Sequence, residues 1–311
     1  MDKKRVIITG NGAVAGAIVR VLVPSGYDVQ TIGLGKEFNV FSELGERSHE
    51  NVSSILKGDS KINPLKDLSG SVYKVPHLQL DLSRKTTGLN PFYGADSVVL
   101  TAANPDSNQN NISAKNNFSI DRNSIDMALE AGARNIVLTS SLWRTARLVN
   151  NSLDELVLPN VNGSPPKYVP YAAAKVKSVR YLQELSKKHK NITFSYVDLG
   201  WYPRSTLGQP ISNVPPRMLQ WWIAECELQQ HYLFLINIDK NRRFKSDINK
   251  GINLFGFNGF SKNYPPINLD HPEFAYDLSN SKRLGVKHEF NVYDVLSSKN
   301  SDWRRIPIFD D

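Results

Sequence analysis

The stretch RVIITGNGAVAGAIVRVLVPSG, residues 5–26, decides the fold. It begins with the short apolar run RVIITG, which is typical of a buried strand, and continues with apolar side chains at helical spacing that end at Gly26. The glycine-rich turn TGNGAVAG, residues 9–16, joins the two. A strand, a glycine-rich turn and a helix in this order form the context that a dinucleotide-binding fingerprint requires.

The residues of this turn have separate physical tasks. Gly10 permits the tight turn, Gly12 lets the backbone approach a pyrophosphate, and a small residue at Ala15 or Gly16 lets the helix pack closely on the strand. The phosphates would lie at the positive end of the helix. A simple tight turn would show a similar pattern. The expected cofactor contacts of the turn are Gly10, Gly12, Ala13, Val14 and Gly16.

Short apolar runs and helical patterns continue to alternate beyond this unit. We predict strands at residues 27–33, 75–82, 95–103, 135–141 and 192–200, and helices near 40–57 and at 116–133 and 170–189. Strands joined by crossover helices form a parallel sheet that is covered on both faces. The expected fold is therefore α/β, a doubly wound parallel sheet of the Rossmann type.

Beyond about residue 203 the alternation gives way to irregular segments in which Pro and Asn are frequent. We therefore divide the chain into a dinucleotide-binding Rossmann domain, residues 1–203, and a smaller substrate-binding lobe, residues 204–311. The lobe is expected to lie over the carboxyl ends of the strands, with part of it returning to the sheet.

Composition and charge exclude several classes of protein. The 311 residues carry 38 basic and 30 acidic side chains, a net charge of +8, but the charges are spread along the chain without a nucleic-acid recognition motif. The single cysteine, Cys226, excludes a disulfide within the chain, and the six histidines lack metal-ligand spacing. No apolar run approaches the roughly 20 residues that span a bilayer, and no signal-peptide cleavage context is present. We expect a cytoplasmic protein without metal, nucleic-acid or membrane partners.

The end of the second predicted strand bears on which dinucleotide binds. A site for NAD usually places an Asp or Glu there to hold the ribose 2′-hydroxyl. The sequence TIGLGK has Gly33 at this position and Lys36 just beyond, so no carboxylate would repel a 2′-phosphate and a cation could meet it. We therefore expect NADP in preference to NAD. Arg47 is an alternative phosphate partner, and Lys36 could also be a solvated loop lysine.

The stretch YVPYAAAKVKS, residues 168–178, places Tyr171 and Lys175 on one face of a predicted helix. A phenol has a pKa of about 10 and is a poor base at neutral pH, but a neighbouring ammonium favours the phenolate. The pair could therefore exchange a proton with an alcohol or carbonyl as a hydride moves. Ser140 and Ser141 end the preceding strand, at the edge where a nicotinamide would lie, and a serine hydroxyl there can hold the reacting oxygen.

The glycine loop, the serine and the YxxxK pair, in this order, resemble the short-chain dehydrogenase/reductase superfamily, and its extended, epimerase/dehydratase branch in particular. The resemblance covers residues 5 to about 203. It implies an NAD(P)-dependent enzyme whose catalytic residues are Ser141, Tyr171, Lys175 and the supporting Asn117. It also implies cofactor contacts at Asp81, Leu82, Thr101, Ala102, Ala103, Tyr171, Lys175, Leu199, Gly200 and Trp201.

Two features depart from the pattern of the extended members. These proteins usually carry TGxxGxxG, whereas this chain has Ala13 in place of the middle glycine and Gly12 one position earlier. The segment between Ser141 and Tyr171 is also long, and we expect it to fold over the substrate.

A shorter similarity concerns the substrate. PPRMLQWWIAECE, residues 215–227, is similar to a segment of uronate dehydrogenases whose Arg contacts the carboxylate of a sugar acid, and this residue corresponds to Arg217. A guanidinium is a planar, bidentate partner for a carboxylate or phosphate. Arg217 could instead only flank a helix that packs in the core. The expected substrate contacts are Ser140, Ser141, Leu142 and Arg217.

The leading hypothesis is an NAD(P)-dependent oxidoreductase that transfers a hydride between the nicotinamide and a sugar or sugar-acid hydroxyl or carbonyl, with Tyr171 as acid/base. A nucleotide-sugar epimerase or dehydratase would use the same side chains with a tightly held cofactor, and a non-catalytic NADP-sensing protein is a third alternative. The helices at 116–133 and 170–189 match those that form a dimer contact in the superfamily. A homodimer is therefore expected, although each helix could instead only bury one stripe against the sheet.

Overall fold

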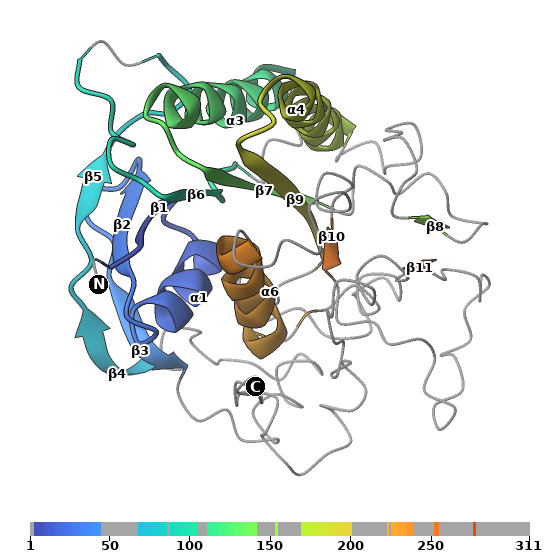
Figure 1. Cartoon of the computed structure of the whole chain (residues 1–311). Helices are drawn as coiled ribbons and strands as arrows, with labels where there is room; N and C mark the ends of the chain where they lie inside the picture. The colour runs from blue at the N-terminus through green and yellow to red at the C-terminus, as the bar shows by residue number, and fades with distance from the viewer. Residues whose placement is uncertain are drawn as a thin grey trace, which may run out of the picture.

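The computed structural model describes residues 3–44, 68–85, 88–104, 111–141, 153–154, 169–200, 223, 225–238, 252–254 and 276–277 (Figure 1). These residues form one seven-stranded sheet with helices on both faces, and two further two-stranded sheets.

The main sheet is parallel throughout. Its strands are β1 (Arg5–Thr9), β2 (Asp28–Gly33), β5 (His77–Gln79), β6 (Ser97–Leu100), β7 (Asn135–Ser141), β9 (Thr193–Leu199) and β10 (Ile252–Leu254). They lie in the order β10-β9-β7-β6-β1-β2-β5, and every neighbouring pair is parallel. The order reverses between β1 and β6, and doubly wound sheets bind their ligands at the carboxyl ends of the strands beside such a reversal. The predicted Rossmann-type α/β fold is confirmed.

Helices cover both faces of the sheet (Figure 1). α1 (Ala13–Leu22) and α6 (Glu225–Asn237) pack on one face, and α3 (Asn111–Glu130) and α4 (Val169–Lys188) pack on the other. Along β7, Val137 belongs to the core under α1 and α6, whereas Ile136 and Leu138 belong to the core under α3 and α4. Because the strands are apolar on both faces, they appear in the sequence as continuous apolar runs. Within the described part of the chain, no helix combines the length and apolar character needed to cross a bilayer.

The start of one predicted element is wrong. Residues 40–57 were expected to contain a helix, but the structure begins this range with strand β3 (Val40–Leu44), which pairs antiparallel with β4 (Leu68–Tyr73). The rest of the range, from residue 45, lies outside the described residues. The partner strand is far along the chain, so a local pattern could not reveal the pairing.

Helix α6 and strand β10 come from the C-terminal third of the chain. α6 packs against α1, and β10 pairs with β9 at one edge of the main sheet. Cys226, in the first turn of α6, is fully buried. β8 (Leu153–Asp154) and β11 (Tyr276–Asp277) form a separate parallel pair. The division of the chain at residue 203 stays a prediction, because most of residues 204–311 lie outside the described residues.

Candidate active site

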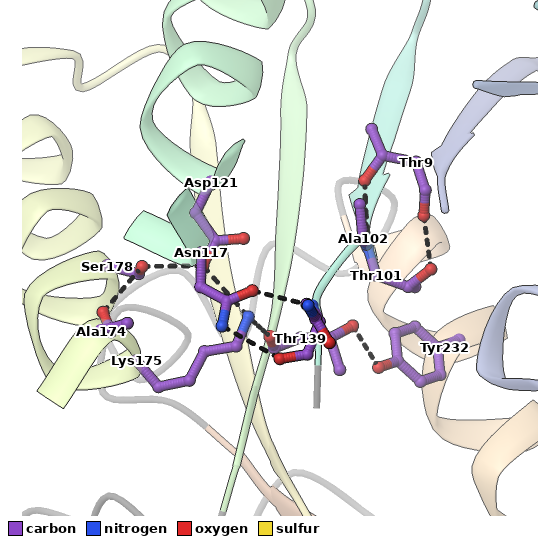
Figure 2. A network of polar contacts seen from close by, with 11 residues as sticks. Thr9, Thr101, Ala102, Asn117, Asp121, Thr139, Ala174, Lys175, Ser178 and Tyr232 are labelled. Atoms are coloured by element: carbon purple, nitrogen blue, oxygen red, sulfur yellow. Dashed lines mark hydrogen bonds and ion pairs between the residues drawn. The ribbon is translucent and has the colours of Figure 1, made fainter. Parts of the chain in front are cut away.

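The candidate site lies at the carboxyl ends of β1, β6 and β7. Figure 2 shows the polar contacts that join these strand ends to side chains of α3, α4 and α6. This is the sheet edge at which the order of strands reverses, so the polar residues gather where the fold predicts a ligand.

The glycine loop depends on the close approach of β1 and β6. Gly10 has a φ of +94°, and a Cβ at this position would lie 2.9 Å from Thr101 Oγ1 and 3.0 Å from the Ala102 nitrogen. The backbone conformation and the crowding both require glycine here. Gly12 differs, because its φ is −93° and a Cβ there would meet no atom of the described residues within 4 Å. The surrounding protein therefore does not demand a glycine at position 12, whereas a phosphate that approaches the backbone would.

The first turn of α1 is suited to an anion. Gly12 is its N-cap and provides no side-chain hydrogen bond, and the turn carries no acidic residue. Ala13 and Val14 begin the helix, and Gly16 is buried one turn further, where its N–H donates to the Gly12 carbonyl at 3.0 Å. The remaining N–H groups of the first turn and the positive end of the helix lie next to the open space at Gly12. These residues fit the pyrophosphate of a nicotinamide dinucleotide.

Thr9 holds the two loops together, a role that sequence reasoning missed. Its hydroxyl accepts hydrogen bonds from the backbone nitrogens of Thr101, at 3.2 Å, and Ala102, at 3.3 Å (Figure 2). The Thr101 hydroxyl in turn donates to the Thr9 carbonyl. Thr101, Ala102 and Ala103 are half-buried at the end of β6, so the predicted cofactor contacts from VVLTAA lie directly beside the glycine loop.

The end of β2 has no carboxylate, and the amide side chain of Asn11, from the glycine loop, lies beside it. Gly33 ends the strand, and the Asn11 side chain lies over it, with Cγ and Oδ1 each 3.4 Å from where a Gly33 Cβ would be. A Cβ at Gly35 would lie 2.5 Å from Asn11 Nδ2, so this turn accommodates the amide closely. Lys36 is exposed just beyond, and Arg47 lies outside the described residues. Asn11 was not predicted as a site residue.

Asp81 and Leu82 have evident structural roles. Asp81 Oδ1 accepts hydrogen bonds from the Ser83 nitrogen at 3.0 Å and the Ser83 hydroxyl at 2.7 Å, and Oδ2 lies 3.5 Å from Arg84 Nε. The Ser83 hydroxyl is the main reason that the pKa of Asp81 lies below its usual value. Leu82 is a core residue under α3 and α4, and its carbonyl accepts from Asn123 Nδ2. A cofactor contact at Leu82 would therefore have to use the backbone.

Asn117 acts on the loop after β6. Its Oδ1 accepts from the Asn104 nitrogen at 2.8 Å, and its Nδ2 donates to the Asn104 carbonyl at 3.2 Å. The side chain is buried in α3. Two bonds to one backbone unit fix the loop after β6, and the supporting catalytic role of Asn117 stays a prediction.

Lys175 is buried in a polar network (Figure 2). Its ammonium donates to Asp121 Oδ2 and to the Thr139 carbonyl, both at 3.0 Å. Burial lowers the pKa of Lys175, but the charges of Asp121 and Tyr171 outweigh burial and hold the pKa above its ordinary value. The side chain therefore stays an ammonium at neutral pH. Asp121 was not predicted from the sequence.

Tyr171 lies in the first turn of α4, half-buried, one helical turn before Lys175. The Ser141 side chain, at the end of β7, lies near enough to lower the pKa of Tyr171 by hydrogen bonding. Burial raises the pKa of Tyr171, Lys175 lowers it and Asp121 raises it, and the net direction is upward. The expected effect of the lysine is present, but it is outweighed, so the phenol is protonated at neutral pH.

The remaining predicted residues differ in their placement. Ser140 is 2% exposed, and its hydroxyl has no hydrogen-bond partner among the described residues, so its side chain lies inside the protein. Leu199 is buried at the end of β9 and Gly200 follows it half-buried. Three predicted contacts lie outside the described residues, namely Leu142, Trp201 and Arg217.

Tyr232 reaches the site from the other face of the sheet. This fully buried residue of α6 places its hydroxyl 2.6 Å from Thr139 Oγ1 (Figure 2). Burial raises the pKa of Tyr232, so it is a neutral phenol. The two residues are 93 positions apart, and no local sequence signal connects them.

Comparisons with known proteins identify solved structures with a similar fold. No family model and no curated protein sequence matches the chain. Among solved structures, the chain is similar to uronate dehydrogenase from Agrobacterium tumefaciens, with a TM-score of 0.57 and 15% identity over 94% of this chain and 87% of that one. It is also similar to vestitone reductase from alfalfa, with a TM-score of 0.61 and 14% identity over 94% of this chain and 96% of that one.

A third similar structure is UDP-glucose 4-epimerase from Thermus thermophilus in complex with NAD, with a TM-score of 0.56 and 15% identity over 94% of this chain and 96% of that one. The chain therefore shares the Rossmann-type fold of these three proteins. This confirms the resemblance drawn from the sequence motifs at the level of the fold.

Proposed function

We propose that the protein is a nicotinamide-dependent oxidoreductase of the extended short-chain type, with Tyr171 as its acid/base. The observation that carries the proposal is that Tyr171 interacts with both Ser141 and Lys175 at the sheet edge that also holds the glycine loop. A phenol, a hydroxyl and an ammonium next to a dinucleotide site are the groups that proton transfer to or from an alcohol oxygen requires.

These side chains divide the proton chemistry among them. Ser141 positions the reacting oxygen, and Tyr171 gives it a proton in reduction or takes one from it in oxidation. Lys175 stabilises the phenolate that Tyr171 becomes, by charge interaction across one helical turn. Asn117 holds the neighbouring loop through the Asn104 backbone. The nicotinamide, when bound, supplies or accepts the hydride.

We infer that the cofactor is NADP in preference to NAD. Gly33 leaves the end of β2 without a carboxylate, the Asn11 amide lies over this position, and Lys36 is exposed beyond it. An amide and a cation tolerate a 2′-phosphate, whereas a carboxylate would repel it. The other proposed cofactor contacts are Gly10, Gly12, Ala13, Val14, Gly16, Asp81, Leu82, Thr101, Ala102, Ala103, Tyr171, Lys175, Leu199, Gly200 and Trp201.

We infer a sugar or sugar-acid substrate from the similarity of residues 215–227 to uronate dehydrogenases. Arg217 would hold a carboxylate or phosphate of this substrate, and Leu142 would contact it beside Ser141. Similarity of the fold to uronate dehydrogenase and UDP-glucose 4-epimerase supports a sugar-type ligand.

Substrate panels test the proposal directly. Purified protein is incubated with NADP or NAD and free sugars and sugar acids, and with the reduced cofactors and the corresponding carbonyl compounds, while reduced nicotinamide is followed by absorbance. Net change of the reduced cofactor is expected. Conversion of a UDP-sugar without net change would indicate an epimerase, and binding without turnover would indicate a sensor.

Tyr171→Phe tests the assigned acid/base. Loss of the hydroxyl is expected to lower kcat by about 10²–10⁴-fold, the usual contribution of a general acid or base. Tyr181→Phe is the matched control, because Tyr181 lies on the same helix and its hydroxyl donates to Asp126 instead. Full turnover by Tyr171→Phe would show that the proposed mechanism is wrong.

A further inference from the structure

One carboxylate lies beside the lysine of the site without a part in the mechanism above. Asp121 is on α3, one turn after Asn117, and its side chain is 1% exposed, while that of Lys175 is 2% exposed. Asp121 Oδ2 lies 3.0 Å from Lys175 Nζ and 2.7 Å from the Ser178 hydroxyl. The two charges form an ion pair enclosed by protein, where solvent screens them little.

The bonding of Asp121 points to the lysine as its principal partner. Its second oxygen, Oδ1, is buried and has no hydrogen-bond partner among the described residues. Buried polar atoms are normally satisfied, so an unsatisfied oxygen indicates a carboxylate kept for a purpose other than packing. Burial raises the pKa of Asp121 above its ordinary value, although Lys175 and the Ser178 hydroxyl counteract burial in favour of the carboxylate.

The charge of Asp121 also reaches Tyr171. In the described part of the chain, the titratable groups that face Tyr171 are Lys175 on its own helix, Asp121 on α3 and Tyr232 on α6. Burial is the largest cause of the raised pKa of Tyr171, and because Tyr232 is neutral, Lys175 and Asp121 supply the opposing charges that act on its hydroxyl. With Asp121 present, a phenolate would face a lysine whose charge is partly compensated.

We propose that Asp121 is a positioning residue that compensates part of the charge of Lys175 and thereby weakens the stabilisation of the Tyr171 phenolate, which favours Tyr171 as a proton donor. The proposal rests on the proposed function and adds the direction in which the enzyme works near neutral pH. The enzyme reduces a carbonyl substrate near neutral pH and oxidises the corresponding alcohol only in alkaline solution.

The chemistry of the assigned direction balances. A hydride from the reduced nicotinamide forms a C–H bond as the carbonyl π bond breaks, and the proton of Tyr171 forms the O–H bond. The substrate gains two electrons and the nicotinamide loses them. The phenolate that remains on Tyr171 regains a proton from solvent before the next turnover.

Ionisation of Tyr171 tests the assignment without any substrate. Near-ultraviolet absorbance of tyrosinate is titrated in the full chain with saturating NADP, and the curve of the Tyr171→Phe variant is subtracted. The same subtraction is made in the Asp121→Asn background. We expect the ionisation midpoint of Tyr171 to fall by about one pH unit or more, because an opposite charge nearby commonly shifts a pKa by 1–3 units.

Ser178→Ala provides a milder variant, in case Asp121→Asn folds poorly. It keeps the carboxyl but removes one of its hydrogen bonds, so a smaller shift in the same direction is expected. Asp126→Asn is the matched control on α3, since Asp126 contacts Tyr181 and Arg122, and it should leave the midpoint unchanged. An unchanged midpoint in both Asp121→Asn and Ser178→Ala would overturn the proposal.

The pH profile of kcat/KM for reduction gives a second readout. Because reduction requires protonated Tyr171, the rate falls as pH rises through its pKa, and Asp121→Asn should move this fall to lower pH. A merely structural defect would lower the rate at every pH without moving the fall, which would also overturn the proposal. Absence of turnover on the whole panel would instead refute the proposed function, and the titration would still decide the role of Asp121.

Discussion

Gly10 and Gly12 are two positions apart, yet they are glycine for different reasons. Gly10 has a positive φ and abuts the end of β6, so the protein itself requires it. Gly12 has an ordinary φ and open space beside it among the described residues, so no contact within that part of the protein requires glycine there. We propose that Gly10 serves the fold and that Gly12 serves the bound phosphate.

We predict that Gly10→Ala lowers the free energy of unfolding by about 1–3 kcal/mol, the usual cost of a residue held in strained backbone. Gly12→Ala should change it by less than about 1 kcal/mol, because only the N-cap preference is altered, but weaken NADP binding at least tenfold. Denaturant unfolding and calorimetric titration of NADP measure the two effects. Equal NADP affinity in wild type and Gly12→Ala would contradict a phosphate at this position.

The sequence predicted some residues of the candidate site and could not predict others. Ser141, Tyr171 and Lys175 stand at recognisable spacings next to predicted strand and helix ends, and the structure brings them together. Asp121 and Tyr232 could not be predicted, because their partners are 54 and 93 positions away. These contacts depend on which helices pack together. Such contacts are properties of the tertiary arrangement and leave no local pattern.

α1 and α6 are joined by a buried ion pair. Arg20 of α1 donates to Glu225 of α6 through Nε at 2.5 Å and Nη2 at 3.0 Å, and both side chains are almost completely enclosed. Gln229 Nε2 donates to the same Glu225 at 3.1 Å and to the Ala17 carbonyl at 3.1 Å. The helix that begins at the glycine loop is thereby tied to the helix that carries Tyr232.

Removal of one member of this pair should be costly. We predict that Glu225→Ala lowers the free energy of unfolding by about 3–5 kcal/mol, because the buried Arg20 guanidinium loses the carboxylate that it contacts through two nitrogens. Urea denaturation measures the loss, and the double change of Arg20→Met with Glu225→Leu should recover much of it. Asp28→Asn, which breaks the exposed pair with Arg5, is the control and should cost less than about 1 kcal/mol. A similarly small effect of Glu225→Ala would show that the pair is not closed to water.

Long helices and parallel strands were predictable, whereas the β3–β4 pair was not. α4 begins and ends within one residue of the range predicted from its apolar periodicity, and β7 coincides with its prediction. β3 has only five residues, and its partner β4 begins more than twenty positions later, so pairing across this distance decided the conformation. Short strands that depend on remote partners are the elements that periodicity identifies least well.

α3 and α4 lie side by side and form the outer layer on one face of the sheet (Figure 1). We predict that two copies associate through these helices, as the family resemblance implies. Light scattering should give about twice the chain mass of 34.9 kDa. Arg180→Glu, at an exposed position of α4, should shift the protein toward the monomer, whereas Lys190→Glu, exposed beyond the helix, should not. A mass of one chain at every concentration would refute the dimer.

Thr139 touches both helical layers at once. Its carbonyl receives the Lys175 ammonium from the side of α4, and its hydroxyl meets Tyr232 from the side of α6. A sheet ordinarily insulates the helices on its two faces from each other, but here a single residue connects them. We therefore expect the two faces of the sheet to be coupled through Thr139. The effect of a substitution at Tyr232 on the free energy of unfolding should depend on whether Lys175 is present. Coupling of this kind would let a structural change in the C-terminal third of the chain alter the surroundings of Tyr171, the proposed proton donor.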